Sequence, residues 1–150
     1  MRLAEESRAR LEQFFRSHEG NAALRLPAVY IHGGYWSHQL TRALRIAAIT
    51  VGRHVFVSRQ YLRKDAGGRW TTPGWLLAHE AAHVRQYQRE GFWPFLVNYA
   101  REYLSLMWKG GKFDAGARAA AYEQIAREQE AREVEAAYLK WRARVPLSLL

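Results

Sequence analysis

Cysteine is absent from the 150 residues of this chain. Its absence excludes disulfide bonds and thiolate metal sites, so histidine and carboxylate side chains would have to bind any metal ion. The hydrophobic fraction of 49% and the aromatic fraction of 13% are ordinary for a globular protein with a packed core. We therefore expect a single domain spanning residues 1–150.

Long hydrophobic runs are also missing. No stretch approaches the roughly 18 apolar residues that a membrane-spanning helix needs, so we expect no transmembrane segment. The first residues, MRLAEESRARLEQFF, are polar and charged and lack the apolar region of a secretion signal. A cytoplasmic location is the default expectation, and export by a specialised secretion system is compatible with the same sequence.

Acidic residues are few compared with basic ones. The 14 Asp and Glu stand against 23 Lys and Arg, which gives a formal net charge of +9. No block of five or more basic residues occurs, and the arginines are scattered among glutamates along expected helices. This pattern indicates a solvated basic surface, and we expect no specific nucleic-acid binding.

Local patterns predict an α+β fold: a small antiparallel or mixed sheet, then a central helix and two further long helices. Three short strands are expected at residues 27–31, 46–50 and 54–58, since each is short, apolar and rich in β-branched or aromatic residues. We divide the chain into an N-terminal helix (1–20), a core (28–90) and a helical part (93–145).

Two signals place the helices. For the central helix, we expect Thr72 as the N-cap, Pro73 as the first helical residue and Gly91 as the C-cap. A second helix should run from about Trp93 to Gly110, and Asp114 should cap a continuous helix that reaches about Arg144.

The central helix carries the motif HExxH, as His79, Glu80 and His83. Residues four apart lie on one face of a helix, so both imidazoles can bind one metal ion, and Glu80 can act as a general base beside it. The 6 His and 12 Glu of this sequence would produce only about 0.02 such motifs by chance. The motif therefore predicts a catalytic zinc site.

A catalytic zinc site requires a third protein ligand and an open position. The other histidines all precede the motif, so we expect a glutamate from the last helix. Helical spacing favours Glu128, which shares a face with Ala121, Ile125 and Leu139, and it leaves Glu130 and Glu123 as alternatives.

Several ordered elements over residues 28–90 resemble a known family. They are Val29-Tyr-Ile-His32, Ala48-Ile-Thr-Val-Gly-Arg-His-Val-Phe56, and Leu77-Ala-His-Glu-Ala-Ala-His-Val84 followed by Gln86. This order is similar to the small zincin-like domain of bacterial proteins linked to extracellular contractile injection systems. The resemblance implies a zinc metallopeptidase scaffold.

The segment Glu128-Gln-Glu-Ala-Arg132 is similar to the third-ligand helix of gluzincin metallopeptidases. In that pattern the glutamate ligand stands three residues before an alanine, which places the ligand at Glu128. The pattern commonly has an acid four residues after the ligand, as a partner for a zinc-bound histidine. This chain has Arg132 there, so that partner is missing at this position.

Zincins commonly receive a peptide substrate at the sheet edge nearest the active-site helix. The strongest β-forming run before the motif is Val55-Phe56-Val57, so we assign the substrate edge to it. Tyr122 is a candidate oxyanion donor. The aromatic and apolar residues of the second helix are expected to pack in the core against the motif helix; they are Trp93, Phe95, Tyr99, Tyr103, Leu106 and Trp108.

Two functions fit the sequence. The first is a zinc-dependent peptidase of gluzincin type, acting on a peptide or protein substrate through Glu80. The second is a non-catalytic zincin-fold module that serves as a docking or cargo domain in a bacterial secretion or injection system. Glu80 favours the enzyme, because a structural zinc site needs no general base.

Overall fold

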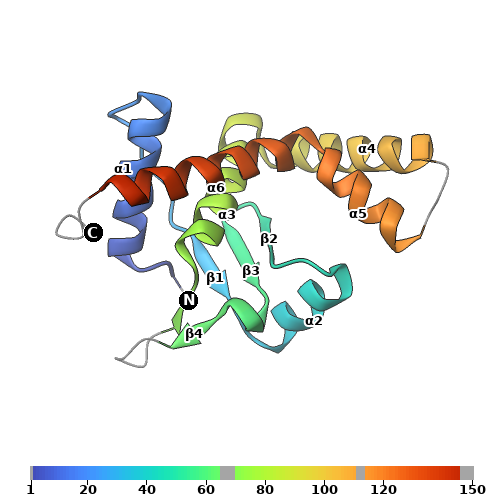
Figure 1. Ribbon diagram of the computed structural model, residues 1–150, viewed down its shortest axis with the longest axis horizontal. Coiled ribbons are helices and arrows are strands. Elements are labelled where there is room, and N and C mark those ends of the chain that lie inside the picture. Colours follow the sequence, from blue (N-terminus) through green and yellow to red (C-terminus); the bar gives the residue numbers. More distant parts are fainter. Residues whose placement is uncertain (1, 65–69, 111–113, 146–150) are drawn as a thin grey trace.

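The computed structural model describes residues 2–64, 70–110 and 114–145, and the chain has an α+β architecture (Figure 1). The helices are α1 (Glu5–Glu19), α2 (Tyr35–Leu44), α3 (Gly74–Glu90), α4 (Phe92–Gly110), α5 (Ala115–Gln124) and α6 (Ala126–Arg144), with a short 3₁₀ turn at Arg59–Tyr61. The strands are β1 (Tyr30–His32), β2 (Ala48–Val51), β3 (His54–Val57), β4 (Arg63–Lys64) and β5 (Trp70–Thr71). None of the described helices has the length and apolarity that crossing a bilayer requires.

The main sheet is mixed and has the strand order β1-β3-β2. Strand β3 pairs in parallel with β1 and antiparallel with β2, so it is the central strand. The assignment of Val55, Phe56 and Val57 to a substrate-receiving edge is therefore wrong. Val55 and Val57 are 1% and 0% exposed and belong to the core. The free edge on the side of α3 is β2.

A tight hairpin connects β2 to β3. Val51 pairs with His54, so only Gly52 and Arg53 lie between the strands. Gly52 has φ 62, in the left-handed region that glycine adopts without a steric cost. This turn fixes the register in which Thr50 faces Val55 and places the Thr50 side chain toward α3.

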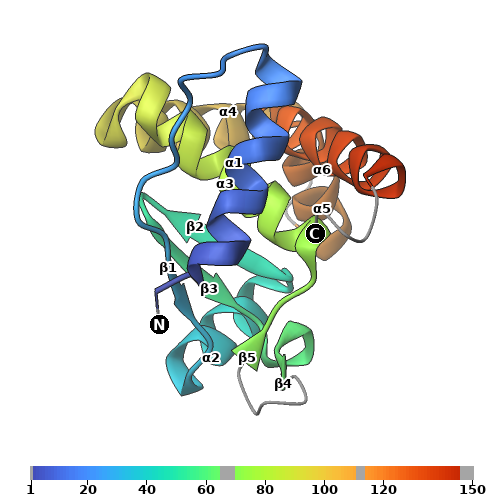
Figure 2. The same ribbon diagram turned by 90° about the vertical axis from the view of Figure 1, so that its left-hand side faces the viewer.

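Helix α3 runs through the centre of the molecule, between β2 and α6 (Figures 1 and 2). Most of its residues are buried around the whole circumference, as expected for a helix inside a core. Ala78, Ala81 and Ala82 are at most 3% exposed, and Ala131 on α6 is 0% exposed. These small side chains let the two helices approach closely, which brings the polar residues of both to one place.

The expected continuous helix from Asp114 to Arg144 is wrong, because the chain breaks at Ile125. This residue has an extended backbone (φ −62, ψ 124), and its side chain is completely buried. The Glu102 carboxylate on α4 accepts a hydrogen bond from the Ala126 N–H at 2.9 Å, which caps the new helix. Three helices therefore follow α3. The predicted Asp114 cap is confirmed, since its side chain accepts a hydrogen bond from the Ala117 N–H.

Helix α4 departs from the expected core packing at its ends. Phe95 is 3% exposed, but Trp93 and Trp108 are 72% and 82% exposed, so core packing is wrong for these two. The main hydrophobic core includes no residue of α4 or α5. These two helices instead pack on each other and on the helices beside them, as a cover over one side of α3.

Candidate metal centre

Three side chains converge where α3 and α6 face each other. His79, His83 and Glu128 each offer a ligand atom, and these atoms all lie within 4.8 Å of one another. The distances are 3.5 Å from His79 Nε2 to Glu128 Oε2 and 3.4 Å from His83 Nε2 to Glu128 Oε1. The three residues predicted as ligands are thus together and can hold a metal ion.

The other ring nitrogen of each histidine is engaged with a fixed acceptor. His79 Nδ1 lies 3.2 Å from Glu135 Oε2, and a carboxylate can only accept, so this nitrogen carries the hydrogen. His83 Nδ1 lies 2.9 Å from Gln86 Oε1.

The orientation of the Gln86 amide follows from its other contacts. Its Nε2 donates to the Arg127 carbonyl and to the Glu130 carboxylate, at 3.0 and 3.1 Å. Its oxygen must therefore face His83 and accept a hydrogen bond from Nδ1. In the neutral histidines both Nε2 atoms then present lone pairs to the Glu128 carboxylate. Such a group of acceptors is stable only with a cation or a proton between them.

Glu128 is 2% exposed, and its Oε2 is buried with no hydrogen-bond partner among the described residues, which fits a metal ligand. The Tyr99 hydroxyl donates to Oε1 at 2.9 Å. Burial by itself would raise the pKa of Glu128, but the neighbouring His79 and His83 imidazoles, when protonated, outweigh burial and lower the pKa. Tyr122 also acts to lower the pKa of Glu128, so this phenol lies beside the site.

Glu80 lies on the same helix, and its side chain meets β2. It is 3% exposed, and the Thr50 hydroxyl donates to its Oε2 at 2.6 Å. Burial raises the pKa of Glu80, while His83 and the Thr50 hydrogen bond act in the opposite direction. A carboxylate with a raised pKa, held at one oxygen and close to the two histidines, suits a proton acceptor near neutral pH.

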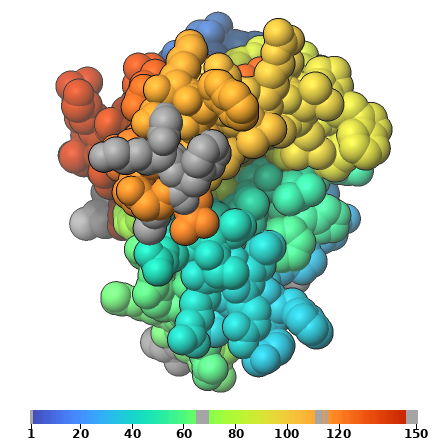
Figure 3. Space-filling view, turned by 90° about the vertical axis from the view of Figure 1, so that its right-hand side faces the viewer, coloured from blue at the N-terminus to red at the C-terminus, as the bar shows by residue number. Residues whose placement is uncertain are grey.

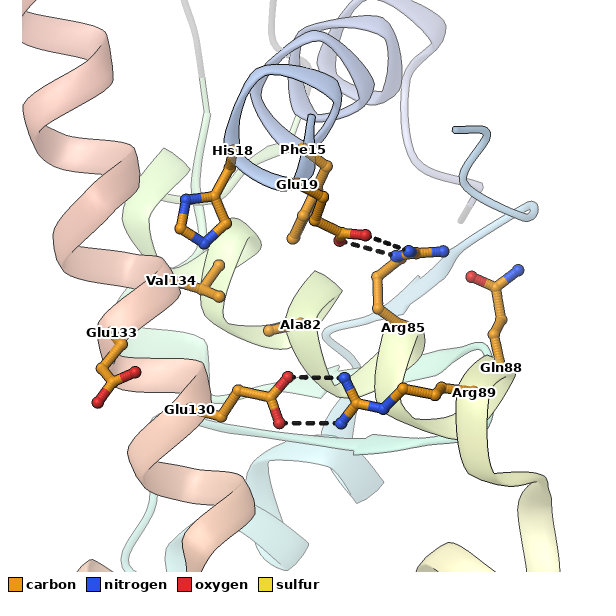
Figure 4. Close-up of a pocket in the computed structure, with 10 residues that line it drawn as sticks. All are labelled: Phe15, His18, Glu19, Ala82, Arg85, Gln88, Arg89, Glu130, Glu133 and Val134. Carbon is orange, nitrogen blue, oxygen red and sulfur yellow. Dashed lines mark hydrogen bonds and ion pairs between the residues drawn. The ribbon is translucent and has the colours of Figure 1, made fainter. Parts of the chain in front are cut away.

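The two alternative third ligands lie elsewhere. Glu130 pairs with Arg89 through two contacts of 2.9 Å and lines a cavity of about 480 Å³ between α1, α3 and α6 (Figure 4). Glu123 is exposed at the end of α5. Neither joins the histidines. The acid missing at position 132 is replaced by Glu135, one helical turn further along α6, while the Arg132 guanidinium lies over the Tyr122 ring.

The site is enclosed. His79 has a side-chain exposure of 12%, and His83 and Glu128 are 6% and 2% exposed. Tyr99 from α4 and Tyr122 from α5 stand against Glu128. Figure 3 shows these two helices above α2 and β2 on this face of the molecule. Any large ligand must therefore pass or displace the α4–α5 pair.

Four further residues complete the site, and sequence reasoning did not assign them roles. Thr50, Gln86, Tyr99 and Glu135 each hydrogen-bond a motif residue or Glu128. A signal existed for Glu135, which lies seven residues after Glu128 and so on the same helical face. No comparable signal existed for Thr50 or Tyr99, because their contacts join segments far apart in sequence.

Together these features define an α+β domain in which two histidines and a glutamate lie close enough to hold a metal ion. The chain belongs to the eCIS core domain family, whose model matches residues 2–91. This relation points to a component of a contractile injection system. No curated protein and no solved structure matched the chain. The family match contains His79, Glu80 and His83 together with Thr50, whereas Glu128 and Glu135 lie outside it.

Proposed function

We propose that the chain is a zinc-dependent metallopeptidase domain of gluzincin type, with His79, His83 and Glu128 as ligands and Glu80 as general base. The observation that carries the proposal is the arrangement of two imidazole lone pairs and one buried carboxylate around a common point, with Glu80 beside it. A zinc site without a catalytic role has no need of a buried carboxylate beside its ligands that does not itself bind the metal.

The histidine-to-carboxylate separations are compatible with zinc. Tetrahedral zinc binds nitrogen and oxygen ligands at about 2.0–2.2 Å, which places neighbouring ligand atoms about 3.3–3.5 Å apart. The two histidine-to-carboxylate distances are 3.5 and 3.4 Å. Three protein ligands leave the fourth position open, as in catalytic sites. Bound zinc would polarise a scissile carbonyl and acidify water at that position.

The residues of the chain would then handle the protons. Glu80 accepts a proton from the attacking water and returns it to the leaving amine nitrogen. The Thr50 hydroxyl, 2.6 Å from Oε2, holds this carboxylate in place. Burial raises the pKa of Tyr122, so the phenol keeps its proton at neutral pH and can donate to an oxyanion. Strand β2, which carries Thr50, replaces β3 as the edge proposed to receive a peptide.

The direct test is cleavage of a peptide library by the purified, zinc-loaded protein. We expect cleavage that a chelator abolishes and added zinc restores. Because the surface is basic, cut sites flanked by acidic residues should be enriched. Zinc-loaded protein that cleaves no peptide of the library would contradict the proposal.

Zinc binding should depend on pH through His83. Burial would lower its pKa, but the hydrogen bond and negative charge of Glu128 raise it to about 9 in the metal-free protein. Below that pH a proton occupies the place of the metal. Apparent zinc affinity should therefore rise about tenfold per pH unit from pH 7 and level off near pH 9, with about one proton released per zinc at pH 7.

Calorimetry in buffers of different ionisation enthalpy measures this proton release, and a zinc affinity independent of pH between 6 and 8 would contradict the assignment. The stability of the metal-free fold changes with pH in the opposite direction to the zinc affinity. The raised His83 pKa stabilises it fully below the unfolded value of 6.5, and this contribution is lost as the pH rises through about 9.

Glu135 should support zinc binding through His79. Glu135→Gln replaces a charged acceptor 3.2 Å from Nδ1 with a weaker one, so we expect a loss of zinc affinity of about 10–100-fold. The exposed neighbour Glu133 provides the matched control, and Glu133→Gln should change affinity by less than about twofold. Competition with a chromophoric chelator measures both. Equal affinities for the two variants would mean that Glu135 does not position His79.

A second candidate function is a docking or cargo module of an injection system. Two observations favour it: the family match, and the enclosure of the site, with Glu80, His83 and Glu128 each at most 6% exposed. In that case zinc would stabilise the junction of α3 and α6. Loss of zinc would then lower the melting temperature but change no hydrolytic activity.

A further inference from the structure

A second cavity, of about 900 Å³, lies on the side of the molecule shown in Figure 2. Its walls come from the first turns of α1, from β5, from the start of α3 and from the end of α6. It contains none of the three metal ligands, nor Glu80. Its volume lies at the upper end of the range of about 300–1,000 Å³ for ligand pockets. We refer to it as the arginine groove.

Positive charge gathers in this groove from three segments that are distant in sequence. Among the described residues, its lining includes four arginines and a single acidic residue, Glu6; the arginines are Arg2, Arg10, Arg63 and Arg142. Arg2, Arg63 and Arg142 are exposed and form no ion pair with any described residue. No local sequence pattern indicates this cluster, because the arginines are scattered along the chain.

The cavity between α1, α3 and α6 provides the contrast. There Arg85 pairs with Glu19 at 2.6 Å, and Arg89 pairs with Glu130 at 2.9 Å (Figure 4). Its arginines are thus already neutralised within the chain. In the arginine groove, three exposed guanidinium groups without such partners share one concave surface, which attracts an anionic ligand.

The floor of the groove is apolar. Leu3, Leu11 and Ile31, which are 9%, 3% and 5% exposed, belong to the hydrophobic core and also line the groove. Trp70 on β5 is 48% exposed, and Trp75 at the start of α3 is half-buried. A simple phosphate has no apolar groups to place on this floor, whereas a peptide with apolar side chains can fill it.

We propose that the arginine groove binds an extended peptide segment in which carboxylate and apolar side chains alternate. In an extended peptide, successive side chains point to opposite sides. Apolar side chains can therefore enter the groove between Trp70 and the aliphatic floor, while the carboxylates between them turn outward to the arginines of the rim. Most of the lining lies within the matched family region, and only Tyr138 and Arg142 come from α6.

Fluorescence anisotropy with a labelled peptide of alternating Glu and Leu tests the proposal on the full chain. The key variant is Arg63→Glu combined with Arg142→Glu, and Arg118→Glu, at an exposed arginine on α5 outside the groove, is the matched control. We expect the double variant to bind at least about tenfold more weakly and the control to stay within about twofold. The same affinity is expected in Glu80→Gln, which separates this site from peptidase activity.

A peptide of opposite charge distinguishes the loss of the arginine contacts from a loss of the fold. The double variant should gain affinity for the corresponding peptide of alternating Lys and Leu, which a misfolded protein would not do. Failure of the wild type to bind the acidic peptide, or equal losses in the double variant and in Arg118→Glu, would overturn the proposal. So would a single-stranded oligonucleotide that binds more tightly than the peptide and depends on the same two arginines, because it would assign the groove to nucleic acid.

Discussion

Replacing Glu128 with alanine is expected to lower the zinc affinity of the protein by more than about a hundredfold. Residues that only orient a ligand contribute about 10–100-fold, and Glu128 is assigned as a ligand itself. Its carboxylate lies 3.4–3.5 Å from both imidazole Nε2 atoms, and its Oε2 is the buried oxygen with no hydrogen-bond partner among the described residues.

Controls on the same part of the chain make this result specific. Glu123→Ala, at an exposed position, should leave zinc affinity unchanged. Glu130→Ala should have an intermediate effect of about tenfold, because Glu130 helps to hold the Gln86 amide that orients His83. Glu128→Gln keeps the shape of the side chain and should still bind poorly, since the amide is neutral. Similar affinities for Glu128→Ala and Glu123→Ala would exclude Glu128 as a ligand.

Replacing Glu80 with glutamine is expected to abolish hydrolysis while zinc stays bound. The amide has the size of the carboxylate and can still accept the Thr50 hydrogen bond at its oxygen. It cannot take a proton from water, and the loss of a general base costs about 10²–10⁴-fold in rate. Zinc content should remain about one per chain, because Glu80 is not among the three ligands.

Two outcomes distinguish the candidate functions. Peptide cleavage that continues at the wild-type rate in Glu80→Gln would exclude the proposed mechanism, whatever the metal content. Zinc-loaded wild type and Glu80→Gln that are equally inactive on every peptide would instead favour the docking module. A melting-temperature shift on zinc removal should occur in both proteins, and it serves as a check that each variant binds the metal.

Local patterns predicted the elements that local forces determine. The i, i+4 spacing of His79 and His83 places both on one face of α3. Glu128 does meet them, but the helical face that it was expected to share with Ala121 and Ile125 does not exist, because the helix breaks at Ile125. Alternating apolar residues predicted a strand at residues 54–58, and β3 spans His54–Val57. For the histidine pair and the strand, the signal lies within a few residues and reflects backbone geometry.

Local sequence patterns could not predict contacts between segments that are distant in sequence. The parallel pairing of β1 with β3 across α2 makes β3 central, and nothing within residues 54–57 indicates which strands flank it. The break at Ile125 depends on a carboxylate of α4 that caps Ala126. Thr50 reaches Glu80 only because the hairpin at Gly52 fixes its register. These features arise from tertiary packing, which overrides local helix and strand preferences.

The most direct test of the account is a crystal structure of the zinc-loaded protein, with zinc located by its anomalous scattering. The account predicts one zinc ion bound by His79 Nε2, His83 Nε2 and a carboxylate oxygen of Glu128 at about 2.0–2.2 Å, with His79 Nδ1 still on Glu135. Zinc bound at any other place, or a Glu128 carboxylate turned away from both histidines, would contradict it.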